Sequence, residues 1–145
     1  MTDIIITENQ SIATFNNVAA SYENSFICSV LEKAAAAGVS IDMIAQSPAT
    51  SDKISFGFTF DDENMTKLLP IINSQKPFIN SGNVKVTVKS REMVDNAGFA
   101  SKVFVALKKL DCLPLLVTTG IDEISILVHR SCRADLEKEL REIFC

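Results

Sequence analysis

The side chains in this sequence that could do chemistry are few and scattered. His129 is the only histidine, and it ends an apolar stretch beside Arg130. A general base needs an orienting partner and a substrate or nucleophile close by, and the neighbouring sequence supplies neither. The acidic run 61–63 resembles a metal site, but it stands where a helix is expected to begin, and the helix dipole favours carboxylates there. We interpret both features as structural.

The four cysteines, Cys28, Cys112, Cys132 and Cys145, form no CxxC pair, and almost no histidine accompanies them. A zinc site requires clustered thiolates or imidazoles, so we interpret these residues as reduced thiols. The sequence also contains no Walker loop, no GxGxxG, no GxSxG and no paired carboxylates at a useful spacing. We therefore expect a protein that is not an enzyme and that has no metal and no cofactor.

Composition narrows the functional class. The chain has 145 residues, of which 47% are hydrophobic and 22% charged, and this is typical of a soluble globular protein with one ordinary domain or two very small ones. A net charge of -4 without a basic cluster argues against nucleic acid. The apolar stretches are shorter than the roughly 20 residues of a membrane helix, and the start resembles no signal peptide. We expect a cytoplasmic protein with no membrane contact.

An internal repeat organises the sequence. Segment 11–72 aligns with segment 84–144, and apolar positions coincide along both. At an offset of 73 residues, Thr14 aligns with Thr87, Phe26 with Phe99 and Val30 with Val103. Farther along, Phe56 aligns with Ile126 at an offset of 70 residues. In the last helix, Leu69 aligns with Leu140 and Ile72 with Ile143 at an offset of 71 residues. Two copies of one small unit are therefore expected.

Each unit is predicted to run strand, helix, strand, strand, helix. Phe26, Val30 and Ala34 recur at helical spacing, and Gly38 suits the position that ends this helix. The expected elements are strands 11–15, 39–45 and 53–60 with helices 24–37 and from 62 in the first unit, and strands 84–90, 113–119 and 123–130 with helices 98–110 and 131–144 in the second.

A three-stranded sheet of this kind usually needs a fourth strand to cover its edge. Segment 76–81 can supply it in the first unit, whereas the second unit is left with the amino-terminal segment 3–7. We predict an α+β, ferredoxin-like fold with antiparallel four-stranded sheets and helices on one face. In this arrangement the first repeat (11–82) is inserted in the second (3–8 plus 83–145).

Three segments resemble a known family. GVSIDMIAQS (38–47), KISFGF (53–58) and MVDNAGFASKVFVAL (93–107) are similar to parts of the tandem ACT domains in the C-terminal regulatory region of aspartate kinases. The resemblance runs from about Ile4 to Phe144, and the sequence contains no kinase domain. It implies a homodimer and a small effector, typically an amino acid such as lysine or threonine, bound at ACT–ACT interfaces.

The resemblance also implies a site, in which the loop before the first helix faces the second strand of a neighbour. The free N–H groups of a helix start can bind a carboxylate. The residues carried over are Glu23, Ser25, Phe26 and Ile27 from the loop and helix start, and Ile41, Asp42, Gln46 and Ser47 from the second strand. Asp42 and Gln46 are the expected side-chain contacts.

Two departures from the family keep other interpretations open. Asn24-Ser25 stands where the family has Pro-Gly, and Leu113-Pro114 where an Asn-Ile pair is common. The site is therefore altered, specific for something else, or lost. Asp42 could instead be a solvated strand residue or part of a dimer interface, Gln46 and Ser47 a polar strand end, and Glu23 and Asn24 helix caps.

The sequence thus favours a non-catalytic regulatory protein that binds an amino acid and whose geometry is read by a partner, which could be a kinase-like chain. The alternatives are a structural or dimerisation module, a regulatory subunit of a split aspartate kinase with a degenerate ligand site, or a fragment of an aspartate kinase.

Overall fold

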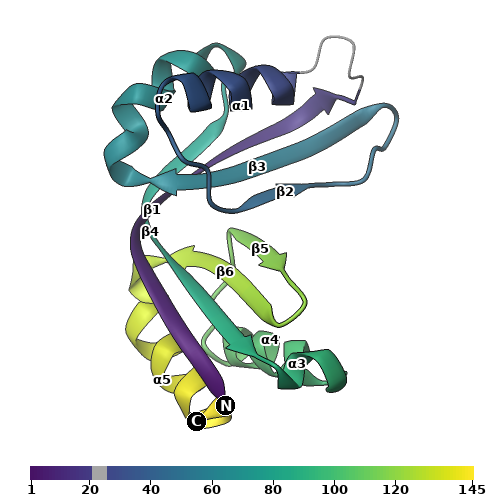
Figure 1. Cartoon of the computed structure of the whole chain (residues 1–145), viewed down its shortest axis with the longest axis vertical. Coiled ribbons are helices and arrows are strands. Elements are labelled where there is room, and N and C mark those ends of the chain that lie inside the picture. Colours follow the sequence, from purple (N-terminus) through teal and green to yellow (C-terminus); the bar gives the residue numbers. More distant parts are fainter. Residues whose placement is uncertain (21–25) are drawn as a thin grey trace. The chain divides into compact units, whose positions relative to one another are not determined.

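The computed structural model describes residues 1–20 and 26–145 (Figure 1). Its elements follow the expected order with a few additions. They are β1 (Thr2–Ala19), α1 (Phe26–Ala36), β2 (Ile44–Gln46), β3 (Lys53–Asp61), η1 (Asp62–Asn64), α2 (Met65–Ile72), η2 (Asn73–Gln75), β4 (Phe78–Ser90), α3 (Glu92–Asp95), α4 (Phe99–Lys109), β5 (Leu116–Thr119), β6 (Glu123–His129), η3 (Arg130–Cys132) and α5 (Arg133–Phe144).

The strand order is β2-β3-β1-β4-β6-β5, and β3 pairs antiparallel with β1 and β2, as β6 does with β4 and β5. The chain divides into two compact units, one of residues 9–81 and one of residues 1–8 with 82–145. The α+β fold predicted from the sequence is confirmed.

Two pairs of strands that the sequence analysis separates are continuous in the structure. Segments 3–7 and 11–15 both lie in β1, and segments 76–81 and 84–90 overlap the single strand β4. The backbone has positive φ angles at Asn9 (58°) and Gly82 (73°). Asn9 is the first residue of the unit 9–81, and Gly82 is the first residue after it. Asn and Gly are the residues that adopt this conformation most easily, so each long strand can pass through it without ending.

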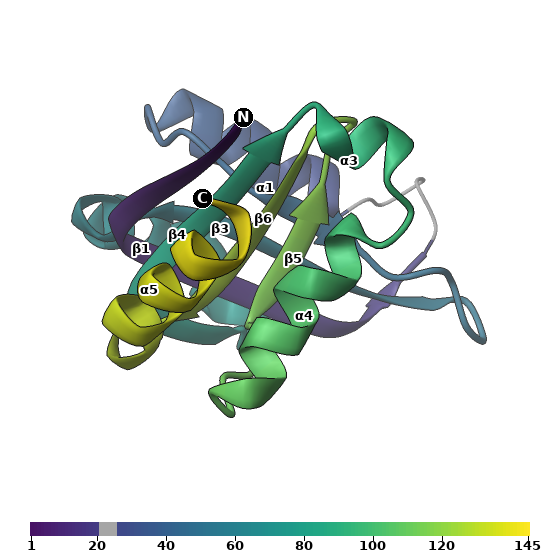
Figure 2. The same cartoon turned by 90° about the horizontal axis from the view of Figure 1, so that it is seen from below.

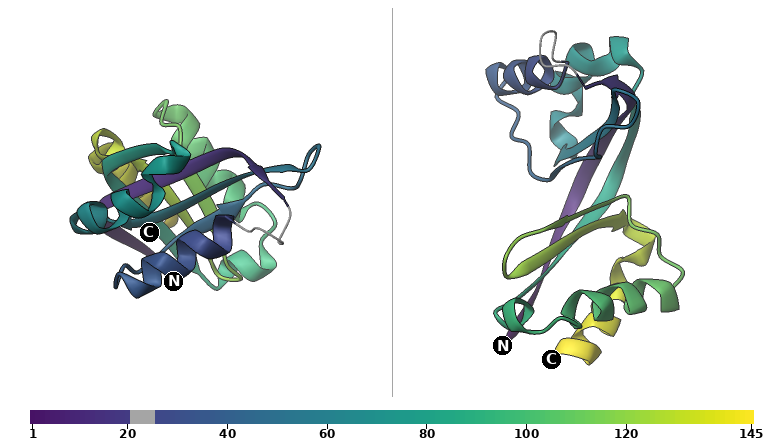
Figure 3. Two further views of the ribbon diagram at one scale, coloured as in Figure 1. Left: turned by 90° about the horizontal axis from the view of Figure 1, so that it is seen from above. Right: turned by 90° about the vertical axis from the view of Figure 1, so that its right-hand side faces the viewer.

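The core of the unit 9–81 is aromatic. Phe56, Phe58 and Phe60 alternate along β3 and are at most 2% exposed, and Phe15 of β1 stacks beside Phe56 and Phe58. The helical residues that cover them are Val30, Ala34, Leu68 and Ile72. Figure 3 shows α1 and α2 on one side of the strands of their unit.

The core of the other unit is mainly aliphatic. Its buried residues are Ile4, Val84, Val86, Val88, Phe99, Val103, Ala106, Leu107, Cys112, Ile124, Ile126, Val128, Leu136 and Leu140. Figure 2 shows α4 and α5 lying across the strands of this unit. At the end of α5, Ile143 is 36% exposed, and Phe144 packs against Phe99 with ring centroids 4.7 Å apart.

The second strand of the first repeat is shorter than the predicted 39–45. Only Ile44–Gln46 form β2, although the N–H of Asp42 still donates to the Thr59 carbonyl (3.0 Å). The N–H of Met43 donates to the Thr59 hydroxyl instead of to a carbonyl (2.9 Å). This side-chain bond interrupts the regular ladder, which explains why the strand begins late.

Gly38 ends α1 as the sequence predicts. Its φ is 75°, and the N–H of Val39 donates to the Ala34 carbonyl at 2.9 Å. This is the left-handed turn that satisfies the last carbonyls of a helix, and glycine adopts it without steric cost.

Candidate functional site

A cavity of about 490 Å³ lies where β1 ends and α1 begins. It is lined by Phe15, Asn16, Asn17, Val18, Ala19, Phe26 and Gln75. The strand end, the helix start and the short turn η2 therefore all contribute to it. This is the part of the unit in which the family resemblance places a ligand.

An irregularity in β1 shapes the cavity. The pairing with β3 shifts register between Phe15 and Val18, and Asn17 has a φ of 57°. Such a bulge turns side chains away from the regular strand alternation, and asparagine tolerates this backbone conformation. Phe15 meets Phe26 edge to face at 4.8 Å, which holds the start of α1 against the strand.

The polar side chains of this cavity are neutral amides. Asn16, Asn17 and Gln75 are exposed, and each provides a carbonyl acceptor and an NH₂ donor. None of the described lining residues titrates near neutral pH. Such a lining can hydrogen-bond a polar small molecule over an aromatic base, but it offers no nucleophile, acid or base for catalysis.

The structure brings the predicted site residues together only in part. Phe26 lines the cavity, and Ile27 and Ile41 pack against the aromatic core of their unit. Glu23 and Ser25 lie outside the described residues.

The polar residues of the second strand lie elsewhere in the same unit. Asp42 and Gln46 are exposed, and Gln46 stands opposite Phe56 in the β2–β3 ladder. The Ser47 hydroxyl accepts the N–H of Ser55 at 2.8 Å and so helps to close this hairpin. None of these three residues lines the cavity.

Asn16, Asn17 and Gln75 were not among the residues predicted from the sequence. An Asn-Asn pair directly after a strand signals a turn or a left-handed backbone, and this signal could have pointed to the end of β1. Gln75 carries no such signal, because only the folding of α2 and η2 brings it next to β1.

The unit 1–8 with 82–145 has a cavity of about 410 Å³ at the corresponding strand end, and this one is charged. It is lined by Met1, Asp3, Lys89, Ser90, Arg91 and Asp122. In the repeat alignment Lys89 and Ser90 take the places of Asn16 and Asn17. The Ser90 hydroxyl accepts the N–H of Glu92, the first residue of the short helix α3, at 3.2 Å.

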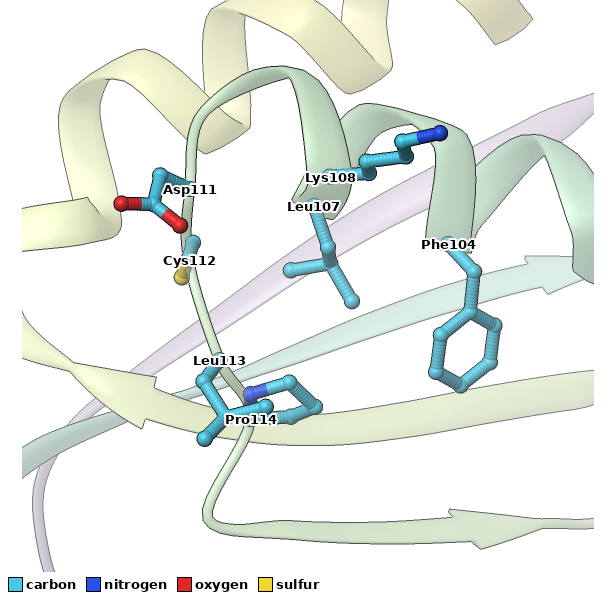
Figure 4. Close-up of a pocket in the computed structure, with 7 residues that line it drawn as sticks. All are labelled: Phe104, Leu107, Lys108, Asp111, Cys112, Leu113 and Pro114. Atoms are coloured by element: carbon cyan, nitrogen blue, oxygen red, sulfur yellow. The ribbon is translucent and has the colours of Figure 1, made fainter.

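A third, mostly apolar cavity of about 270 Å³ lies at the end of α4 (Figure 4). The side chains of Phe104 and Leu107 point from the helix toward the segment with Leu113 and Pro114. That segment, expected to begin a strand, precedes β5, and Leu113 is 87% exposed.

Other expected features have local roles. The Nδ1 atom of His129 accepts the N–H of Ser131 at 3.2 Å, which caps the turn η3. Within residues 1–20 and 26–145, no three His, Cys, Asp or Glu side chains are grouped to hold a metal ion. In the same part of the chain, every helix is too short or too polar to cross a membrane.

No model of a known protein family matches the chain. Among curated proteins it is similar to an aspartokinase of Geobacillus stearothermophilus, with 24% identity over 110 residues, and to one of Bacillus sp. (strain MGA3), with 21% over 113 residues. These matches cover 74% and 73% of this chain but only 27% and 28% of the relatives. The chain thus spans about a quarter of the length of these relatives.

Solved structures share the fold over almost the whole chain. The regulatory subunit of aspartate kinase from Thermus thermophilus, in its ligand-free form, matches with a TM-score of 0.86 at 13% identity and covers 98% of this chain and 97% of that one. Aspartate kinase from Synechocystis matches with a TM-score of 0.87 at 15% identity, over 97% of this chain and 26% of that one. The resemblance to the regulatory ACT domains of aspartate kinases is confirmed as a likeness of fold.

Proposed function

We propose that this chain is a non-catalytic regulatory protein that binds a free amino acid at the cavity between the end of β1 and the start of α1. The observation that carries the proposal is the amide lining of this cavity, in a fold shared with regulatory subunits of aspartate kinase. Lysine and threonine are the leading candidates, as the family resemblance implies.

The proposed contacts divide between two copies of the chain. One copy supplies the cavity and the start of α1, whose N–H groups suit the carboxylate of an amino acid. The second strand of the neighbouring copy supplies Asp42 and Gln46 for the amine or the side chain. Because Asp42 and Gln46 are exposed and lie outside the cavity of their own unit, this division accounts for their positions.

Regulation would follow from linkage. An amino acid that binds only one geometry of the dimer shifts the population toward that geometry, by as much as its affinity for the two geometries differs. A kinase-like chain that contacts the dimer would then respond to the amino acid.

The direct test is thermal unfolding of the full chain with each of the twenty amino acids at millimolar concentration, followed by calorimetry on those that stabilise it. A ligand at a hundredfold excess over its Kd should add about 2.7 kcal/mol to the free energy of unfolding. Asp42→Asn and Asn16→Ala should both weaken binding, whereas Lys89→Ala in the other unit should not. Stabilisation by none of the twenty would contradict the proposal.

A second candidate function is assembly without a ligand. β2 and β5 are the first and last strands in the strand order, so each presents a strand edge. Such an edge can pair with a strand of another chain. On β2, Ile44 is 46% exposed. In that case the chain would dimerise in sedimentation experiments and retain a kinase-like partner in pull-downs. Neither the dimerisation nor the binding of the partner would change when an amino acid is added.

A further inference from the structure

The charged cavity of the unit 1–8 with 82–145 is built from three separate stretches of the chain. They are the start of β1, the end of β4 with the residue after it, and the turn between β5 and β6. Figures 2 and 3 show the start of β1 beside the end of β4. All of its lining residues belong to one unit, so this cavity of about 410 Å³ is formed without a second copy of the chain.

The four charged side chains of this cavity do not neutralise one another. Lys89 and Arg91 supply two positive charges, and Asp3 and Asp122 supply two negative charges. In the part of the chain that the structure describes, none of these four side chains has an ion-pair partner. A ligand that matches the lining must therefore carry groups of both signs.

A buried hydroxyl group adds a hydrogen-bond donor to the lining. Ser90 is 2% exposed, and its oxygen accepts the N–H of Glu92 at 3.2 Å. A serine hydroxyl can accept and donate at the same time, so its O–H can still donate to a ligand. The N–H of Ser90 also donates to the Asp122 carbonyl at 2.8 Å. This bond fixes the backbone of two lining residues, which lowers the cost of ordering them around a ligand.

We propose that this cavity is a second binding site, selective for an amino dicarboxylic acid such as aspartate or glutamate. The two carboxylates of such a ligand match Lys89, Arg91 and the Ser90 hydroxyl. Its ammonium group matches Asp3 and Asp122. A dicarboxylate without an amine would leave both aspartates unpaired, and a basic amino acid would bring its extra charge against two cations.

The proposed ligand differs in charge from the one proposed for the cavity at the end of β1. That cavity has neutral amides over an aromatic base, whereas Met1 is the one apolar side chain among the lining residues here. The chain would then respond to two ligands of different charge, one for each unit. Neither proposal rests on the other, so a chain that ignores lysine and threonine could still bind aspartate.

Isothermal calorimetry on the full chain with L-aspartate, L-glutamate and succinate tests the proposal. The protein should carry no amino-terminal tag, because Met1 lines the cavity. We expect one aspartate or glutamate to bind per chain. Succinate, which has two carboxylates but no ammonium group, should bind more weakly.

Four exposed positions provide variants that should all fold. Arg91→Gln should weaken aspartate binding about ten- to a hundredfold, because it removes a charged hydrogen-bond donor. Asp3→Asn should weaken the binding of aspartate but not that of succinate, since only aspartate has an ammonium group. Lys102→Gln, outside the cavity in the same unit, and Asn16→Ala, in the other unit, are the controls and should leave the Kd unchanged.

Three results would overturn the proposal. The first is that neither amino acid binds at millimolar concentration, and the second is that the parent protein binds succinate as tightly as aspartate. The third is an equal loss of aspartate binding with Arg91→Gln and with either control. Such a loss would indicate non-specific attraction in the case of Lys102→Gln and binding at the end of β1 in the case of Asn16→Ala.

Discussion

The two units place a cavity at the same point of the repeat but line it with different chemistry. In the unit 9–81 the end of β1 carries the neutral pair Asn16 and Asn17, and in the other unit the end of β4 carries Lys89 and Ser90, with Arg91 beside them. The order of strands and helices sets where a cavity forms, whereas the side chains at the strand end decide what it can bind. A repeat can thus keep its fold while only one copy keeps a given ligand.

The cores provide the largest expected difference between the units. Phe56 and Ile126 are aligned in the repeat and are 2% and 0% exposed. Phe56→Ala should lower the free energy of unfolding by about 3–5 kcal/mol, and Ile126→Ala by about 2–5 kcal/mol, because each leaves a cavity in a packed core. Urea unfolding measures both, and the exposed Leu113→Ala serves as the control, with a change below about 0.5 kcal/mol.

The same pair of variants tests how independent the units are. If the units unfold together, both variants shift one common transition. If they unfold separately, Phe56→Ala shifts only the transition of the unit 9–81, and a tyrosine or fluorine probe placed in each unit would distinguish the two cases. A loss of less than 1 kcal/mol for Phe56→Ala would contradict the packing described for this unit.

The two cavities provide the next comparison. Asn16→Ala removes an amide from the neutral cavity and should weaken amino-acid binding about tenfold. Lys89→Ala changes the aligned position of the charged cavity and should leave the Kd unchanged. Isothermal calorimetry on both variants measures this, and the reverse result would assign the ligand to the other unit.

The ends of α1 and α4 give a smaller, paired prediction. Gly38 and Asp111 are aligned, have φ angles of 75° and 50°, and precede residues whose N–H groups each donate to a helix carbonyl at 2.9 Å. Gly38→Ala should cost about 1 kcal/mol of stability, because a Cβ atom is strained there although nothing lies within 4 Å of it. Asp111→Gly should gain about 0.5–1 kcal/mol for the same reason. Thermal unfolding checks both signs, and a stabilising Gly38→Ala would be inconsistent with this geometry.

The smallest expected effect concerns an ion pair at a position where the aligned residue of the other unit has no charged side chain. The Nζ atom of Lys109 lies 2.8 Å from Glu139, whereas the aligned residue of α1 is Ala36. The hydrogen bond to Glu139 raises the pKa of Lys109 above its ordinary value of 10.5. A raised lysine pKa means that the pair stabilises the fold below pH 10.5 and that this contribution is lost as the pH rises further.

Lys109→Gln should therefore unfold at a slightly lower urea concentration than the parent protein at neutral pH, and the difference should vanish in strongly alkaline solution. High salt should reduce the difference at neutral pH, because the Lys109 side chain is 62% exposed. The matched control is Lys108→Gln, because Lys108 is next to Lys109 in the sequence. This variant should show no such pH dependence.

The fold was predictable where local patterns repeat. Alternation of Phe56, Phe58 and Phe60 indicated a strand, helical spacing of Phe26, Val30 and Ala34 indicated α1, and Gly38 indicated its end. What local patterns could not indicate was the continuity of β1 through Asn9, because one left-handed asparagine usually marks a turn. The choice between Ile143 and Phe144 was also not local, since it depends on the ring of Phe99 from another helix.

The candidate site was predictable to a lesser extent. The family resemblance pointed to the region between the first strand and the first helix, where Phe26 does line a cavity. It could not supply Gln75, which reaches β1 only through the tertiary arrangement. It placed Asp42 and Gln46 in a strand, and the structure puts both on the surface of the same unit, so their part in binding stays a prediction about a neighbouring copy.

Binding of an amino acid at the end of β1 is the central claim about this molecule. An ¹⁵N NMR titration of the full chain with lysine and with threonine tests it most directly through the side-chain amide signals. Binding of either amino acid should shift the signals of Asn16, Asn17 and Gln75 and leave that of Asn96, in the other unit, in place. Side-chain amide signals that stay fixed with both amino acids, or backbone N–H signals that move only around Lys89 and Arg91, would contradict the claim.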